Sequence, residues 1–166
     1  MSAAVRVARR EDAPRILELV RELAEYEKAA HEVVARVEDY ERDGFGERPL
    51  FSALVAEEGA RIVGFALYFF AWSTWEGRGA LRLEDLYVEP ARRGSGVGLA
   101  LMRALAAEAK RAGCTRFEWQ VLDWNAPAIA FYEKLGARVL PEWRVVRITG
   151  EALDRLGDAT ARTAGT

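Results

Sequence analysis

The chain has 166 residues, of which 51% are hydrophobic and 30% are charged, and its formal net charge is −2. These values predict a soluble globular protein of one domain and exclude the strongly basic surface that nucleic acids and anionic membranes attract. Cys114 is the only cysteine and His31 the only histidine, so an intramolecular disulfide and a histidine-based metal site are excluded. No apolar run is long enough for a membrane span or a signal segment. We expect a cytoplasmic protein with no metal, no nucleic-acid partner and no membrane partner.

The first half of the chain predicts a strand, two helices and a hairpin. Period-two alternation and strand formers indicate the strands. Acids and Pro14 at the start of the first helix are typical of a helix N-terminus. The expected bounds are 5–8 (strand), 11–28 (helix), 37–42 (helix), 51–57 (strand) and 61–70 (strand).

The second half predicts strands that alternate with helices, after a loop at 72–79. The expected bounds are 81–88 (strand), 99–113 (helix), 116–121 (strand), 127–135 (helix) and 142–148 (strand). Residues 157–166 have no apolar period and are expected to form a frayed tail. This order predicts an α/β (α+β) fold whose mixed sheet has helices on both faces, and not a doubly wound parallel sheet.

A basic, glycine-rich turn at 92–98 separates the strand at 81–88 from the following helix. Strand, glycine turn and helix N-terminus form a common pyrophosphate site, because backbone N–H groups converge there and the helix dipole attracts an anion. The dinucleotide fingerprint would need glycine where Leu99 stands, and a Walker loop would need Lys-Ser or Lys-Thr at its end. An ordinary glycine-rich connection is the alternative. The run from Arg93 to Gly98 matches the R/Q-x-x-G-x-G/A pattern, and the chain resembles the GNAT N-acetyltransferases.

Five runs are similar to the diamine (spermidine/spermine) acetyltransferase branch of that family. They lie at 22–27, 43–46, 72–77, 83–88 and 121–132. The resemblance implies a single GNAT domain at 1–156 with a tail at 157–166. It also implies a mixed, mostly antiparallel sheet with a splayed cofactor-binding strand pair, acetyl-CoA as co-substrate, and a homodimer.

The resemblance also implies which residues bind acetyl-CoA: the main chain of the strand's end, the glycine loop, an asparagine and a tyrosine. These are Leu86, Tyr87, Val88, Arg93, Gly94, Ser95, Gly96, Val97, Gly98, Leu99, Asn125 and Tyr132. Purely structural roles are the alternatives for the last two residues: Asn125 could be a helix N-cap, which Asn-x-Pro suits, and Tyr132 could pack in a core.

The resemblance implies that Tyr132 and Glu84 are the catalytic residues. An alkyl ammonium must lose a proton before it attacks a thioester, and a carboxylate such as Glu84 can accept that proton. Tyr132 matches the acid that protonates the leaving thiolate. The implied acceptor-binding residues are Glu27, Glu84, Asp85, Ser73, Trp75 and Glu118. Glu84 and Asp85 could instead be solvated strand charges, although adjacent strand residues face opposite ways.

The resemblance implies a small primary amine as the acceptor, and two kinds of amine are considered. Polyamine-acetylating relatives carry an acid where this chain has Ser73 and Thr74, and the Ser-Thr-Trp form resembles the sister type associated with thialysine. A thialysine-like amino acid and a di- or polyamine both stay open. Arg78 or Arg82 could meet the carboxylate of an amino acid. Acetylation of a protein or peptide, and a silent CoA-binding GNAT module, are the alternatives.

Overall fold

The computed structural model describes the backbone of residues 3–163 and the side chains of residues 3–158. The chain forms two compact units, Met1–Gln120 and Val121–Thr166. No helix in the described part of the chain is long and apolar enough to cross a membrane.

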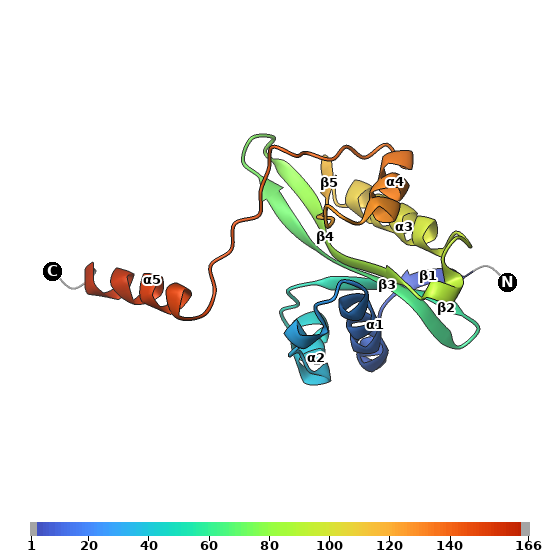
Figure 1. Ribbon diagram of the computed structural model, residues 1–166, viewed down its shortest axis with the longest axis horizontal. Helices are drawn as coiled ribbons and strands as arrows, with labels where there is room; N and C mark the ends of the chain where they lie inside the picture. Colours follow the sequence, from blue (N-terminus) through green and yellow to red (C-terminus); the bar gives the residue numbers. More distant parts are fainter. Residues whose placement is uncertain (1–2, 164–166) are drawn as a thin grey trace. The chain divides into compact units, whose positions relative to one another are not determined.

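The first unit is built on one five-stranded sheet (Figure 1). Its strands follow the chain in the order β1 (Ala4–Val7), β2 (Ser52–Glu58), β3 (Arg61–Ser73), β4 (Arg78–Val88) and β5 (Arg116–Glu118). The first three pairings are antiparallel, and β4 pairs with β5 in parallel. The prediction of a mixed, mostly antiparallel sheet is therefore confirmed.

Helices cover both faces of this sheet, as predicted. Figure 1 shows α1 (Ala13–Tyr26) and α2 (Val37–Phe45) on one face and α3 (Val97–Arg111) on the other. Because strand side chains alternate between faces, Val55 joins the cluster that contains Ile16 of α1, whereas its neighbours point the other way. Short 3₁₀ turns lie at Arg10–Asp12, Ala30–Glu32 and Pro90–Arg92.

The parallel strand is shorter than predicted, and this opens one edge of β4. β5 pairs only with residues Ala80, Leu81 and Arg82 of β4 and ends at Glu118 instead of residue 121. From Leu83 to Val88, β4 has a strand partner on its β3 side alone within the described sheet. The backbone groups on the other edge of this part of β4 are therefore not paired with a strand. This is the feature expected of a splayed β4–β5 pair.

The second unit contains two helices, α4 (Ala126–Lys134) and α5 (Gly150–Thr163). The strand predicted at 142–148 is wrong: this segment has no regular structure, and Val146 is 94% exposed. A strand needs a partner for its backbone groups, and the described residues of this unit contain no strand.

Residues 157–163 belong to α5, where a frayed tail was expected, and residues 164–166 lie outside the described residues. Helix formers such as Ala and Leu fill its first turns. Glu151 and Arg155 pair there at 3.2 Å.

Candidate functional site

Two adjacent acids lie where β4 is irregular. Asp85 pairs with Leu67 and Leu83 pairs with Tyr68, so Glu84 is the extra residue of a β-bulge. A bulge bends its strand and redirects side chains, and bulges are common beside functional sites. Glu84 is exposed and Asp85 is partly buried. The bulge therefore places these two carboxylates in different environments at the start of the open edge.

The glycine turn joins β4 to the N-terminus of α3 in a conformation that its glycines make possible. Gly94 has φ +75° and Gly96, the N-cap of α3, has φ +91°. A side chain on either would meet no atom within 4 Å, so the turn faces open space. The first intrahelical bond runs from Ala100 N to Gly96 O at 2.9 Å, which leaves the N–H groups of the preceding helical residues without partners inside the helix.

This arrangement fits a pyrophosphate, because it combines an open, glycine-shaped loop with a helix N-terminus. Ser95 adds rigidity by donating its hydroxyl to Arg92 O at 2.6 Å. Arg92 pairs with Glu58 at 2.8 Å. The Arg93 guanidinium lies over the Tyr26 and Tyr87 rings, and its Nε donates to Val88 O at 3.1 Å. Both arginines thus fix the base of the loop within the protein.

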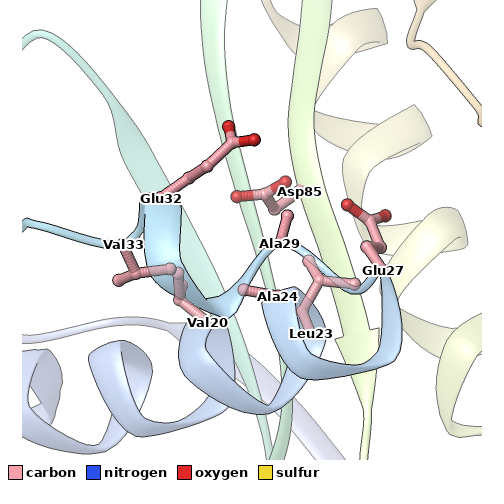
Figure 2. Close-up of a pocket in the computed structure, with 8 residues that line it drawn as sticks. All are labelled: Val20, Leu23, Ala24, Glu27, Ala29, Glu32, Val33 and Asp85. Carbon is pink, nitrogen blue, oxygen red and sulfur yellow. The ribbon is translucent and has the colours of Figure 1, made fainter.

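An acidic pocket lies between the end of α1 and the bulge in β4 (Figure 2). Its volume is about 170 Å³, and its residues are Val20, Leu23, Ala24, Glu27, Ala29, Glu32, Val33 and Asp85. Figure 2 shows the carboxylates of Glu27, Glu32 and Asp85 along one side, with apolar side chains of α1 on the other. Such a cavity can receive a cationic head group that has an aliphatic stem.

Among the described residues, three acidic side chains and no basic side chain line this pocket. None of Glu27, Glu32 and Asp85 forms an ion pair with another described residue. Burial, followed by repulsion from Glu84 and Glu27, raises the pKa of Asp85 to about 6. Burial also raises the pKa of Glu27. A cation in the pocket would reverse these effects. The described residues contain no cluster that could hold a metal ion.

Glu27 is held in the pocket by the way α1 ends. Ala29 N donates to Ala24 O at 2.8 Å and Lys28 N donates to Glu25 O at 3.1 Å, which is the pattern of a Schellman motif. Lys28 occupies the left-handed position with φ 60°, where glycine is the usual residue. The C-cap residue Glu27 is therefore fixed by backbone hydrogen bonds on both sides.

The remaining acceptor residues expected in this unit lie elsewhere. Ser73 is buried, and its Oγ accepts a hydrogen bond from Glu76 N at 3.2 Å in the β3–β4 hairpin. It is six residues along β3 from Leu67, the partner of Asp85, which is about 20 Å at strand geometry. Trp75 is 85% exposed in the same hairpin. Glu118 pairs with Arg82 at 3.6 Å and Arg116 at 3.7 Å. Only Glu27 and Asp85 of the expected acceptor residues line the pocket.

Asn125 and Tyr132 belong to the second unit. Asn125 is the N-cap of α4, with its Oδ1 accepting from Ala128 N at 3.3 Å, as Asn-x-Pro predicted. Tyr132 lies on α4, and its ring centre is 5.4 Å from that of Phe131. Their roles toward acetyl-CoA stay predictions.

Two features of the site were missed from the sequence. Glu32 lies in a short 3₁₀ turn without periodicity, and nothing in its neighbourhood indicates a pocket. The contact of Tyr26 with Arg93 joins residues 67 positions apart, although both lie in runs that the family pattern had singled out.

Comparison with known proteins identifies the family. The model of the "Acetyltransferase (GNAT) family" matches residues 13–137. The chain is 43% identical to a mouse (Mus musculus) protein named thialysine N-epsilon-acetyltransferase, with 93% of this chain and 97% of that protein covered. It is 36% identical to the human (Homo sapiens) spermidine/spermine N(1)-acetyltransferase-like protein 1, over 90% of this chain and 23% of that protein.

A solved structure shows the same architecture. An integron cassette protein from the mobile metagenome of V. cholerae superposes with a TM-score of 0.79 at 27% identity, covering 95% of this chain and 98% of that one. Together with the mixed sheet, the splayed β4 and the glycine loop, these matches identify a GNAT-like α/β domain. The chain belongs to the acetyltransferase (GNAT) family and is an N-acetyltransferase.

Proposed function

We propose that the protein transfers the acetyl group of acetyl-CoA to the primary amine of a small cationic acceptor, either a thialysine-like amino acid or a di- or polyamine. The observation that carries this proposal is the acidic pocket, where Glu27, Glu32 and Asp85 form no ion pair with another described residue. The pocket's apolar side suits an aliphatic stem. The names of the mouse and human relatives, which specify thialysine and spermidine/spermine, support the same acceptor class.

The acetyl-CoA side of the proposal uses the open edge of β4 and the glycine loop. When bound, acetyl-CoA supplies an activated thioester carbonyl to the amine. Main-chain groups of Leu86, Tyr87 and Val88 would hold the pantetheine arm. N–H groups from Gly94 to Leu99 would hold the pyrophosphate, since they surround the N-terminus of α3. Asn125 and Tyr132 complete the proposed set through the family pattern.

Proton removal from the acceptor is assigned to the two carboxylates at the bulge. An alkyl ammonium has a pKa near 10 by analogy with lysine, so a base must accept its proton. Glu84 is the base that the family pattern indicates, and it is open to solvent. Asp85 adjoins it in the pocket, and its pKa of about 6 suits a group that accepts a proton near neutral pH. Tyr132 is proposed to give a proton to the leaving sulfur.

We also propose a cytoplasmic homodimer that binds neither nucleic acid nor membrane. The net charge of −2 and the single cysteine support the location and the lack of anionic partners. The dimer rests on the family resemblance.

The proposal is tested by thiol release from acetyl-CoA with a panel of thialysine, lysine, putrescine, spermidine, spermine and a lysine-containing peptide. We expect saturable release with the small amines and N-acetylated products of matching mass. Asp85→Asn should raise the KM of the amine at least about tenfold, and Glu25→Gln, which neutralises an exposed acid of α1 outside the pocket lining, is the control. Turnover of the peptide alone would replace a small acceptor with a protein acceptor.

A further inference from the structure

The first residue of the glycine loop is held by the end of α1. The guanidinium carbon of Arg93 lies 4.9 Å from the centre of the Tyr26 ring and 5.4 Å from the centre of the Tyr87 ring. A guanidinium within about 6 Å of an aromatic centre is attracted by the ring's quadrupole. These three residues, named here the Arg93 stack, join α1, β4 and the loop at one point.

The stack is anchored on the α1 side as well as on the sheet. Tyr87 donates its hydroxyl to Glu22 at 3.2 Å, and Glu22 also accepts from Arg15 at 3.4 Å. Arg15 in turn donates at 2.5 Å to Glu89, which is buried directly after β4. Because charged groups tie the two elements on both sides of the stack, α1 and the base of the loop cannot shift independently without breaking these bonds.

The same end of α1 also carries a wall of the acidic pocket. Tyr26 is the last residue of the helix, and Glu27, the C-cap, lines the pocket. The Schellman bonds and the left-handed Lys28 fix the backbone immediately beyond them. The Tyr26 ring and the Glu27 carboxylate are therefore carried by one hydrogen-bonded turn of backbone, so a shift of this turn displaces both.

We propose that Tyr26 is a positioning residue that couples the cofactor loop to the acidic pocket, so that each substrate binds more tightly when the other is present. The inference rests on the proposed function, since it takes the loop as the CoA site and the pocket as the amine site. An amine attracted to Glu27 steadies the end of α1 and, through the stack, the loop. By linkage, CoA at the loop favours the amine by the same factor.

The test is calorimetric titration of CoA, which has no acetyl group to transfer, with and without saturating thialysine. We expect thialysine to tighten CoA binding by roughly two- to fivefold in the wild type, since the link is one cation–π contact of modest strength. Tyr26→Phe keeps the ring and should keep this factor. Tyr26→Leu removes the ring and should bring the factor to about one, with CoA still bound. Thermal melting of each variant verifies that it is folded.

The possible outcomes separate the inference from the function on which it rests. Coupling that persists in Tyr26→Leu, or that is absent from the wild type, overturns the positioning role and leaves the acetyltransferase assignment intact. Loss of coupling in Tyr26→Phe as well as in Tyr26→Leu overturns the role of the ring. Failure of the wild type to bind CoA at all overturns the proposed CoA site and the inference together.

Discussion

Replacing Asp85 with asparagine should stabilise the free protein and impair amine binding. The negative charge of Asp85 lowers the stability of the free protein but attracts the cationic amine. In the free protein the Asp85 carboxylate is partly buried near Glu84 and Glu27, and its pKa rises from 3.8 to about 6. Because the folded protein holds the Asp85 proton more tightly than the unfolded chain does, protonation of Asp85 favours the folded state. This contribution to the free energy of unfolding is fully present below pH 3.8 and is lost as the pH rises through 6. Ionised Asp85 therefore opposes folding at neutral pH.

The magnitude follows from the pKa difference. A rise from 3.8 to about 6 corresponds to about 3 kcal/mol between the protonated and ionised forms. Because the pocket opens to solvent and Asn is not identical to protonated Asp, we expect Asp85→Asn to gain about 1–2 kcal/mol at pH 8. The gain should vanish near pH 4, where Asp85 is protonated in the wild type.

The assay is urea unfolding of the wild type, Asp85→Asn and Glu25→Gln between pH 4 and pH 8, beside the KM of thialysine for each. Glu25→Gln removes an exposed charge from α1 and should change neither the free energy of unfolding nor the KM appreciably. Equal stability of Asp85→Asn and wild type at all pH values would refute the burial cost. A stabilised variant with unchanged KM would refute the assignment of the pocket to the amine.

Three further predictions concern the other parts of the site. Gly96→Val should raise the acetyl-CoA KM at least about tenfold, because Val at φ +91° distorts the loop. Gly59→Val is the control, since it strains the backbone similarly at φ +62° in the β2–β3 turn. Calorimetry should show that CoA binding is lost in Gly96→Val alone. Tyr132→Phe should lower kcat by roughly 10²–10⁴-fold with smaller effects on both KM values, as loss of a general acid requires; a wild-type kcat from pH 7 to 9 would show that water donates the proton. Thialysine should have a higher kcat/KM than spermine. Ser73→Asp should reduce the ratio of these two kcat/KM values only several-fold, since a carboxylate in the β3–β4 hairpin reaches only the far end of a polyamine. A wild type that prefers spermine, or a ratio that Ser73→Asp leaves unchanged, contradicts this prediction.

Local sequence predicted the parts of the site that depend on local backbone. The strand, glycine turn and helix from Leu81 to Ala109 have their own signals of alternation, glycine and helical period, and the structure contains each. Asn125 was predicted as an N-cap because Asn-x-Pro is a local pattern, and its side chain accepts the capping bond. Glu27 and Asp85 were named through the family resemblance, which gave their identity and not their environment.

Features set by distant pairing could not be predicted in the same way. The bulge at Glu84 depends on how β4 pairs with β3, and alternation in one strand does not reveal the register of its neighbour. The segment at 142–148 has the composition of a strand, but the described part of its unit has no strand to pair with it. Glu32 joined the site because a short turn folds back over α1, which no periodic pattern indicates.

We propose that this N-acetyltransferase draws a small cationic amine into the pocket of Glu27, Glu32 and Asp85. The most direct measurement is amine-dependent release of CoA from acetyl-CoA, followed by mass spectrometry, for thialysine and putrescine with wild type and Asp85→Asn at pH 8. We expect acetylated amine with the wild type and at least about a tenfold loss of kcat/KM in the variant. Release of CoA that no small amine increases, or an Asp85→Asn variant as efficient as the wild type, would contradict it.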